Sequence, residues 1–415
     1  MAIPLAPADV PDISRQAFWS LPPSERAPVF ADLRRSHPVS LQPAPQSTLI
    51  PARPFWAVTT HADVQHVSRH ADVFCSGEGV GMADIPVEFL ELNSSFLVMD
   101  APRHTQLRRI VSGAFTPRRV AQLDEAISAE GVRFVDEFVE AGGGDVVDGL
   151  SKRLPLWTIS SMMGVPEEMR PDLYRAAEGM ITIQDPEFLA SGQDPLTLAM
   201  ECAGELHRIA GELVAARRRH PADDILSALA DAQIDGELID AQELGSIFVL
   251  FAVAGNDTTR NSTSHGIKLF ADHPDQWERL RADPALMAPA IEEIVRCASP
   301  VIHFRRTATT DTELGGAQIA AGDPVVMFYE SANRDEGVFA DPDRFDIGRD
   351  PNPHVGFGGG GPHFCLGANL ARAELRATFS RLVERVASFD AGPPDHLTSS
   401  FINGIKRMPV EVAPA

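Results

Sequence analysis

Apolar residues recur at intervals of three and four over much of the chain, which is the spacing of amphipathic helices. The segment AQLDEAISAEGVRFVDEFVEAGG (121–143) shows this pattern most clearly and ends in glycines, as many helices do. Further helical patterns follow up to about residue 235, and a short one is expected near Pro23–Ser36. Alternating patterns are sparse, and TELGGAQIAAGDPVVMF (312–328) predicts short strands around turns. The chain is therefore predicted to be mainly α with a small β portion.

The sequence contains no internal repeat and no long linker, so we expect a single domain over residues 1–415. Within it we expect a β-rich N-terminal part at roughly 38–75, a helical body at 100–300 and an irregular loop at 355–367. Gly77–Ser95, with its glycines and a proline, is expected to form a loop.

The segment from Asp240 to Ala271 has no proline and would span about 48 Å as one helix, at 1.5 Å per residue. Its middle, SIFVLFAVA (246–254), is apolar on every face, which predicts burial in the core. Asp257 follows closely, and a buried acid is costly unless it is paired or has a chemical task. The alternative is that the helix simply ends near Gly255.

The composition, with 44% hydrophobic and 23% charged residues, is ordinary for a globular protein. A net charge of −22 disfavours a nucleic-acid partner, because an acidic surface repels phosphates. No run of about 18 apolar residues appears, and the N-terminal stretch lacks the apolar centre of a signal peptide, so we expect neither a membrane span nor secretion. The expected location is the cytoplasm, with reduced thiols.

Four cysteines, Cys75, Cys202, Cys297 and Cys365, are scattered without the spacing of a zinc site or a redox dithiol. Cys365 stands apart because it lies in FGGGGPHFCLGANLAR (357–372), after four glycines and just before an amphipathic stretch. A lone cysteine thiolate can be the axial ligand of an iron porphyrin, and the glycines would let a flat macrocycle approach the main chain. The alternative is a buried structural cysteine before a helix.

FGGGGPHFCLGANLAR strongly resembles the haem-binding signature of the cytochromes P-450, and further motifs of that family occur in the family order. EEIVR resembles the family's Glu-x-x-Arg pair, here Glu293 and Arg296, and FADPDRF resembles the segment whose arginine, Arg344, joins that pair. AGNDTT resembles the oxygen-handling motif of the central helix, and DAPRHTQLRR the haem-contacting helix. The resemblance covers nearly the whole chain and implies the cytochrome P-450 fold, with a long central helix over haem b.

The spacing departs from the family pattern at one point. Phe357 and Cys365 are eight positions apart where the family usually has seven, so one residue is inserted and the local path of the loop over the haem is left open. Some bacterial members share this longer form. AGNDTTRN and HFCLGANLAR are most similar to the group that hydroxylates steroid side chains and methyl-branched lipids, and bacterial terpene hydroxylases are also similar.

By motif position, the resemblance assigns the haem site to His104, Arg108, Ala254, Gly255, Arg306, Phe357, Gly358, His363, Cys365 and Gly367, with Cys365 as the iron ligand. The two histidines and two arginines of this set would hold the haem propionates through charge-assisted hydrogen bonds. Arg305 competes with Arg306 for this role, and His363 could equally cap the loop.

The resemblance makes Asp257 and Thr258 the expected catalytic residues. Thr258 would lie beside bound dioxygen and Asp257 would relay protons, while Ala254 and Gly255 would leave room for the oxygen. The alternatives are a salt bridge from Asp257 to an arginine, and a bond from the Thr258 hydroxyl back to a helix carbonyl.

From family position, the substrate pocket is expected to be lined by Phe96, Leu250, Val253, Val301, Ile302 and Ile402. All are apolar, which favours an apolar substrate. Each of them could equally be an ordinary core residue.

The chain carries no fused flavin or ferredoxin segment and no Rossmann glycine fingerprint, so electrons must come from outside. A basic cluster on the proximal side of the haem is expected from Arg109, Arg118, Arg119, Arg372 and Arg376. In an acidic protein this cluster favours an acidic ferredoxin, with its ferredoxin reductase, as the partner. The alternative is a solvated helix face.

Together these features predict a haem-thiolate monooxygenase, acting as a monomer, that hydroxylates an apolar steroid, branched lipid or terpenoid with O2 and two external electrons. The alternatives are a peroxygenase that uses hydrogen peroxide, and a haem protein that binds a ligand without turnover. The acid–threonine pair in NDTT argues against both. The sequence does not name the substrate, the ferredoxin or the position hydroxylated.

Overall fold

The structure is a computed structural model that describes residues 10–45, 52–190 and 193–415. Residues 1–9 of the N-terminal stretch lie outside the described residues, as do residues 46–51 of the expected β-rich part.

Helices make up most of the described chain, as predicted. They are α1 (Gln16–Trp19), α2 (Pro23–Ser36), α3 (His61–Arg69), α4 (Val87–Leu92), α5 (Arg103–Ser112), α6 (Pro117–Glu140), α7 (Arg153–Met162), α8 (Arg170–Thr182), α9 (Pro195–Arg219), α10 (Ile225–Ala230), α11 (Ala241–Asp272), α12 (Pro274–Ala282), α13 (Met287–Ala298), α14 (Tyr329–Ala332) and α15 (Ala368–Arg385). The helical stretch expected at Pro23–Ser36 is α2.

Short strands form the smaller β portion. They are β1 (Val39–Gln42), β2 (Phe55–Val58), β3 (Phe74–Cys75), β4 (Gly143–Asp145), β5 (Gln233–Ile234), β6 (Glu237–Leu238), β7 (His303–Ala308), β8 (Thr312–Leu314), β9 (Ala317–Ile319), β10 (Pro324–Phe328), β11 (Val386–Ala391), β12 (Asp395–His396), β13 (Ile405–Arg407) and β14 (Pro409–Pro414). The strands expected within 312–328 are β8, β9 and β10.

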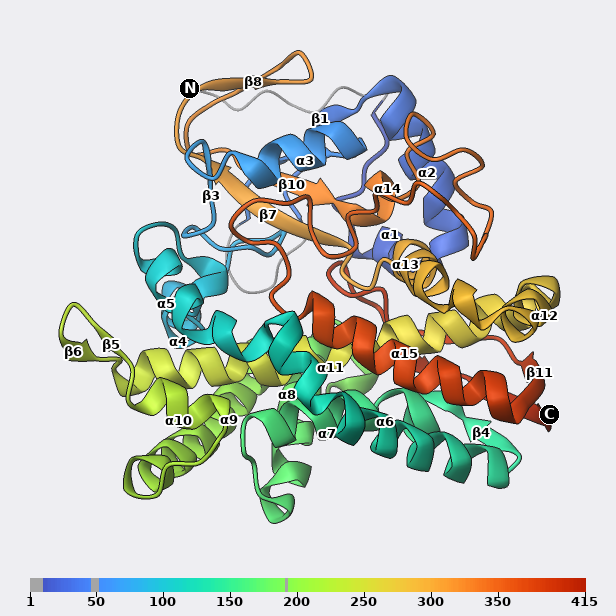
Figure 1. Cartoon of the computed structure of the whole chain (residues 1–415). Coiled ribbons are helices and arrows are strands. Elements are labelled where there is room, and N and C mark those ends of the chain that lie inside the picture. The colour runs from blue at the N-terminus through green and yellow to red at the C-terminus, as the bar shows by residue number, and fades with distance from the viewer. Residues whose placement is uncertain (1–9, 46–51, 191–192) are drawn as a thin grey trace.

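The largest sheet joins early and late parts of the chain, in the order β1-β2-β10-β7-β3. Within it β2 and β10 are parallel, and the other pairs are antiparallel. Figure 1 shows this sheet with α2 and α3 in the upper part of the molecule, and helices α6, α7, α9, α11 and α15 in the lower part. The segment 355–367 leads into α15 between these two parts.

The long central helix is one continuous element of 32 residues, α11, whose first turn is capped by the Asp240 carboxylate accepting from the N–H of Glu243 at 2.7 Å. It packs against α7, α8, α9, α13 and α15, and most of its side chains are buried. The helix does not end near Gly255, so that alternative is wrong, because packing on every side stabilises the helix beyond the glycine.

One local expectation is wrong. The segment Gly77–Ser95, expected to be a loop, contains the short helix α4 after Pro86. Within the described part of the chain, no helix is both long enough and apolar enough to cross a lipid bilayer.

Candidate active site

The loop before α15 closes on itself despite its inserted residue. The N–H of Cys365 donates to the Phe357 carbonyl at 2.9 Å, and the N–H of Phe364 donates to the Gly361 carbonyl at 3.2 Å. Gly358, Gly360 and Gly361 take positive φ values of 101°, 94° and 78°, which only glycine adopts readily. The extra position is therefore absorbed in a tight glycine turn upstream of the cysteine.

Two of these glycines are required by a neighbouring helix. A Cβ on Gly361 would lie 2.2 Å from the carbonyl oxygen of Ser68 on α3, and one on Gly359 would lie 2.6 Å from the Ser68 hydroxyl. The sequence predicts glycines here because a macrocycle would approach the main chain closely. At positions 359 and 361 the approach is instead to α3, which holds the loop against the upper part of the molecule.

Cys365 opens into a cavity between α11 and the start of α15. The predicted site residues that line this cavity are Phe96, Arg108, Leu250, Ala254, Gly255, Thr258, Val301, Phe357, Gly358, His363, Cys365 and Gly367. Most of the lining is apolar. Sequence reasoning missed other lining residues, which are Leu97, Phe115, Ile159, Phe251, Thr259, Ser262, Val295, Pro300, Phe304, Tyr329, Gly356, Phe364, Leu366, Leu370, Ala371 and Glu374.

The environment of the Cys365 sulfur contains groups that stabilise a thiolate. Burial raises the pKa of the thiol, while the Gly367 N–H and the charges of Arg108 and Arg372 lower it. These groups converge on a lone sulfur, and among the described residues no set of three or more His, Cys, Asp and Glu side chains could hold a metal ion. The donor set therefore suits a metal that brings most of its own ligands, as iron does in a porphyrin.

Four basic side chains gather at one edge of the cavity. The rings of His104 and His363 lie 4.2 Å apart between centroids, and the buried Nε2 of His104 has no hydrogen-bond partner in the described part of the chain. Burial lowers the pKa of His104, and burial with the charges of Arg306, His104 and Arg108 lowers the pKa of His363 to about 2. His363 Nε2 contacts the Ser76 hydroxyl at 3.1 Å, so the groups of this cluster that best fit the anionic propionates of a haem are the His104 Nε2 and the two guanidinium groups.

The geometry separates the two competing arginines of β7. The Arg305 guanidinium donates to Asp84 at 2.7 Å and to the backbone of the Glu78–Gly79 turn. Among the described residues, Arg306 donates only to the Arg305 carbonyl, at 2.8 Å, and its charge lowers the pKa of both histidines. Arg306 therefore has N–H groups free to bind an anionic ligand beside His104 and His363. The N–H groups of Arg305 are instead bonded to Asp84 and to the Glu78–Gly79 turn.

Asp257 and Thr258 face in different directions from α11. Thr258 lines the cavity and its hydroxyl donates to the Ala254 carbonyl at 3.0 Å, which is the back-bond given as the alternative. Asp257 is 1% exposed and lies 2.9 Å from the Arg260 guanidinium, which lies 3.1 Å from Glu178 on α8. Burial raises the pKa of Asp257 to about 6, although the charge of Arg260 lowers it. The salt bridge to an arginine is thus present.

Three predicted pocket residues do not line the cavity. Val253 and Ile402 pack together behind Val301 in a small apolar cluster with α8. Ile302 is wrong as a pocket residue, because it is fully buried in the core formed by α1, α2 and β10. Successive side chains of an extended segment point to opposite faces, so when Val301 faces the cavity Ile302 faces away from it.

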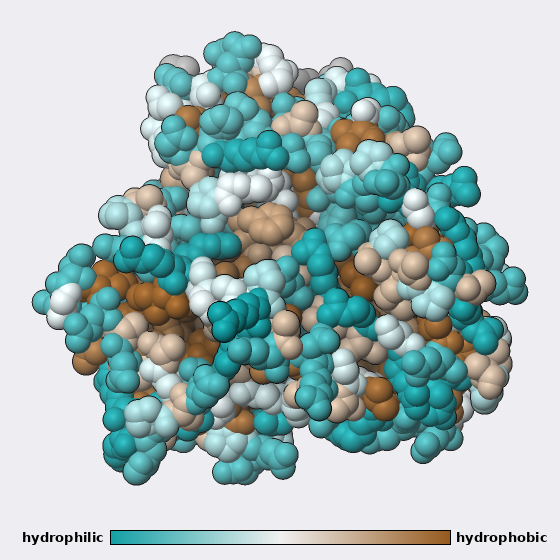
Figure 2. All heavy atoms as spheres, viewed as in Figure 1, coloured by the Kyte–Doolittle hydropathy of each residue, from teal (hydrophilic) through white to brown (hydrophobic). Residues whose placement is uncertain are grey.

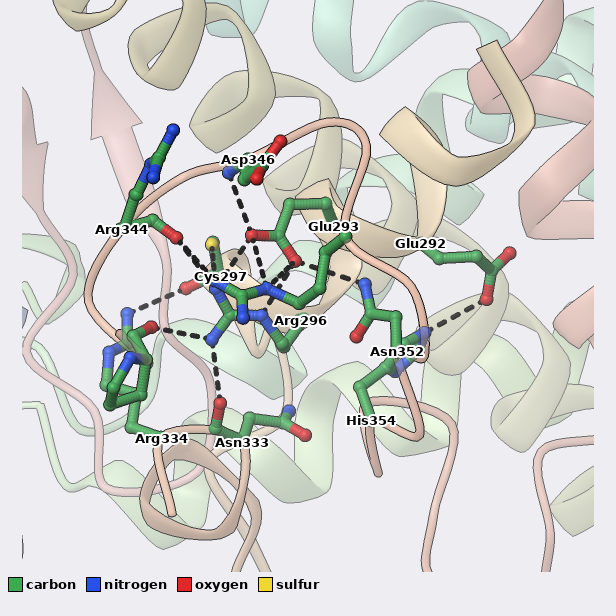
Figure 3. A network of polar contacts seen from close by, with 12 residues as sticks. Glu292, Glu293, Arg296, Cys297, Asn333, Arg334, Arg344, Asp346, Asn352 and His354 are labelled. Atoms are coloured by element: carbon green, nitrogen blue, oxygen red, sulfur yellow. Dashed lines mark hydrogen bonds and ion pairs between the residues drawn. The ribbon is translucent and has the colours of Figure 1, made fainter. Parts of the chain in front are cut away.

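Glu293 and Arg296 form a buried ion pair on α13, with both side chains 0% exposed and distances of 2.7 and 2.8 Å (Figure 3). The arginine that joins them is Arg349, whose Nε lies 3.1 Å from Glu293, so the expectation for the Arg344 side chain is wrong. Arg344 contributes its backbone carbonyl, which accepts from Arg296 at 3.2 Å. The network fixes the segment before the loop through the N–H of Asp346, which donates to Glu293 at 3.0 Å.

The five arginines expected to form a basic cluster differ in their pairing. Arg119, Arg372 and Arg376 each form an ion pair, with Asp223, Glu292 and Asp124 respectively. Arg109 and Arg118 are exposed, and no ion pair joins them to another described residue. Arg69 was missed, and its guanidinium lies beside Gly360 of the loop, since a Cβ there would be 3.0 Å from the Arg69 Nε.

A lone thiol in a mostly apolar cavity, with basic side chains nearby, is a donor set that suits a haem-thiolate site. The family model for Cytochrome P450 matches residues 49–387. This chain therefore belongs to the cytochrome P450 family, and it is a haem-dependent monooxygenase, a class of enzyme that uses dioxygen and redox partners.

Its relatives include enzymes of the two groups that the motifs had indicated. The chain is 41% identical over 414 residues to the methyl-branched lipid omega-hydroxylase of Mycobacterium tuberculosis, covering 97% of this chain and 96% of that protein. It is 42% identical over 398 residues to the steroid C26-monooxygenase of Rhodococcus jostii, covering 94% and 82%. Cytochrome P450 CYP268A2 of Mycobacterium marinum, solved in complex with pseudoionone, superimposes with a TM-score of 0.95 at 47% identity, covering 98% and 99%.

Proposed function

We propose that this monooxygenase hydroxylates an apolar lipid-like, steroid-like or terpenoid molecule, using electrons from a ferredoxin and its reductase. The observation that carries the substrate class is the mostly apolar lining of the cavity, to which Phe96, Leu250, Val301 and Phe304 contribute. The relatives named for methyl-branched lipids and steroids, and the complex with pseudoionone, support the same class.

In this proposal the haem is held by residues from three parts of the chain. Cys365 ligates the iron, and when bound the haem supplies oxygen activation, which a thiolate ligand favours by donating electron density. His104, Arg108, Arg306 and His363 hold the propionates with donors that the protein leaves without anionic partners. The other proposed contacts to the haem come from Ala254 and Gly255 on α11, and from Phe357, Gly358 and Gly367 around the cysteine.

Thr258 and Asp257 divide the handling of protons. Thr258 presents its hydroxyl at the cavity wall, where it can hold a proton or a water. Asp257, with a pKa of about 6, can exchange protons near neutral pH, a property suited to a relay. The Asp257 side chain pairs with Arg260, which also pairs with the partly exposed Glu178 on α8. If the Asp257 side chain rotates away from Arg260 toward the cavity, it can carry a proton from this group of residues to the cavity wall.

The electron donor docks, in this proposal, on a face formed by Arg109, Arg118 and Arg69, of which Arg69 lies beside Gly360 of the loop that carries Cys365. These side chains are exposed, and their positive charge in a protein of net charge −22 would steer an acidic partner to this face. Arg119, Arg372 and Arg376 are proposed to contribute less, because each already neutralises an acid.

The test is to screen steroids, branched lipids and terpenoids for the haem spin-state shift, and then to analyse products with a ferredoxin pair. Thr258→Ala should keep NAD(P)H oxidation near the wild-type rate while more electrons leave as hydrogen peroxide, because the hydroxyl that directs the proton is lost. Asp257→Asn should slow the whole cycle. Ser264→Ala is the matched control, since Ser264 is buried on the same helix and back-bonded to Arg260 at 3.1 Å. Wild-type coupling and rate in both variants would refute these roles.

A further inference from the structure

A second cavity, the α5–α10 cleft, lies outside the haem site, between α5, α6, α7 and α10. Its volume is about 300 Å³, and its mostly apolar wall includes Leu123 and Ile127 of α6 and Ile225 and Leu229 of α10. Figure 2 shows apolar side chains gathered around a hollow on this face, near the position of α5 in Figure 1. Because apolar walls hold water weakly, an apolar molecule would displace water from this cleft favourably.

The volume of the cleft limits the size of its occupant. A cavity of about 150 Å³ holds one benzene molecule. A space of about 300 Å³ therefore suits a molecule of roughly twice that size, about twelve non-hydrogen atoms. A steroid is larger than this, so the cleft suits a compact ring molecule and is not a second copy of a steroid pocket.

The charged groups that line the cleft are already paired. Arg119 lies 2.8 Å from Asp223 at the mouth, where the Asp223 side chain is 88% exposed. Asp224 is paired with Arg217 of α9 and accepts from the N–H of Ser227 at 2.7 Å. A charged occupant would leave water without finding a free counter-ion, which is costly. The cleft therefore favours a neutral molecule.

One hydroxyl group in the wall of the cleft offers a polar contact. The Ser161 hydroxyl on α7 accepts from Arg170 at 3.4 Å, so its hydrogen stays available for an oxygen of the occupant. The Thr158 hydroxyl on the same helix donates its hydrogen to the Leu154 carbonyl at 2.9 Å and has no second hydrogen to give. A hydrogen bond from Ser161 therefore suits an occupant with one hydroxyl or carbonyl oxygen.

Two helices contribute to the walls of both cavities. On α5, Arg108 lines the haem cavity and Ile110 lines the cleft. On α7, Ile159 lines the haem cavity and Trp157 lines the cleft. Two positions correspond to about 200° around a helix, so opposite sides of each helix face the two cavities. An occupant of the cleft would therefore contact the far side of the helices that reach the haem site.

We propose that the α5–α10 cleft is a second binding site, for a neutral apolar molecule of roughly twelve non-hydrogen atoms with one hydroxyl or carbonyl oxygen, and that its occupant braces α5. Arg108, the proposed propionate ligand, leaves the haem only if α5 moves. An occupant that fills the space beside Ile110 resists this movement, so it should slow haem loss. Because coupling between two sites is reciprocal, bound haem should tighten binding in the cleft by the same factor.

Binding is tested with menthol, a monoterpene alcohol of this size, by equilibrium dialysis against the haem-loaded protein. Ala126 is exposed on α6 and lines the cleft, so Ala126→Phe places a ring at its mouth. The wild type should bind one more menthol molecule than Ala126→Phe, with a dissociation constant on the order of 0.1 mM for a ligand of this size. Ala121→Phe is the matched control, since Ala121 is exposed on the same helix and does not line the cleft. Equal numbers bound by the wild type and Ala126→Phe, or no binding to the wild type, would overturn the proposal.

The polar contact is tested separately. Ser161→Ala should weaken the binding of menthol in the cleft about fivefold, because one hydrogen bond is lost. The hydrocarbon p-menthane, which has the same ring but no oxygen, should bind equally to the wild type and to Ser161→Ala. An affinity for menthol that Ser161→Ala leaves unchanged would refute the assignment of an oxygen-bearing occupant.

The bracing of α5 is measured as the rate at which haem passes to an excess of apomyoglobin. Menthol should slow this transfer about fivefold more in the wild type and in Ala121→Phe than in Ala126→Phe. Equal slowing in all three proteins would contradict the bracing. The coupling rests on the proposed role of Arg108, and the two fail differently. Haem transfer that is unchanged in Arg108→Gln refutes the role of Arg108, while dialysis still reports on the cleft.

Discussion

Replacing Glu293 by Gln would leave two guanidinium groups, those of Arg296 and Arg349, facing a neutral amide (Figure 3). Burial would raise the pKa of Glu293, but the bonds and charges of these arginines and the Asp346 N–H hold it below the usual value. Glu293 is therefore the charged acceptor of the network. A glutamine keeps one acceptor oxygen and turns an amide N–H2 toward donors, so at least one buried guanidinium loses its anion.

Removing one partner of a buried ion pair costs roughly 3–5 kcal/mol, which is a large share of the roughly 5–15 kcal/mol that stabilises a protein. An unfolding entropy of about 2.1 cal/mol/K per residue gives about 0.9 kcal/mol/K for 415 residues. The expected fall in Tm is therefore about 3–6 °C, with earlier loss of haem, because Arg296 and Arg349 also fix the chain that leads to the Cys365 loop.

The assay is thermal unfolding followed by haem absorbance and circular dichroism together. Glu212→Gln is the control, because the pair of Glu212 with Arg208 on α9 is about half exposed and is expected to contribute about 1 kcal/mol or less. Equal Tm changes in Glu293→Gln and Glu212→Gln would refute the reasoning, since burial of the pair would then have no energetic consequence.

Three further outcomes are expected. Cys365→His should abolish the red-shifted Soret band of the reduced carbon monoxide complex that marks thiolate ligation, and survival of the band would remove Cys365 as ligand. Arg109→Glu and Arg118→Glu should slow ferredoxin-driven reduction several-fold and flatten its salt dependence, with substrate binding unchanged. The control is Arg35→Glu on α2, which lies far from α5 in Figure 1, and equal reduction rates in all three variants would contradict the docking surface. Val301→Phe should narrow the cavity and shift the product profile at unchanged haem content, and an unchanged profile would place Val301 outside the substrate site.

The sequence predicted the parts of the molecule that are encoded locally. The apolar run 246–254 and the absence of proline indicated α11, and the structure has that helix as one element. Glu293 and Arg296 are three positions apart on one helix, so their pairing is visible in the chain itself. The loop around Cys365 was recognisable for the same reason, because its glycines, histidine and cysteine are consecutive.

Interactions between distant segments were beyond that reasoning. Arg344 and Arg349 are both near the Glu293 network, and only the path of the chain decides that the side chain of Arg349 enters it. Arg119, Arg372 and Arg376 look like free cations in the sequence, whereas acids brought from other segments neutralise them. The sequence gives charges, but their availability to a partner depends on tertiary neighbours.

Glu374 shows why the same limit applies to chemistry. In the sequence it lies in ARAELRATF, an amphipathic stretch rich in charges, where a glutamate is ordinarily solvated. The fold buries it because α15 crosses between α6 and α11, and that crossing brings a threonine of α7 and one of α11 to the same carboxyl group. Burial then converts a group that would be an anion in water into a neutral acid at the edge of the haem cavity. A neutral acid can therefore arise at a position that the sequence does not mark, wherever packing removes water from a carboxyl group and leaves it hydroxyls as its neighbours.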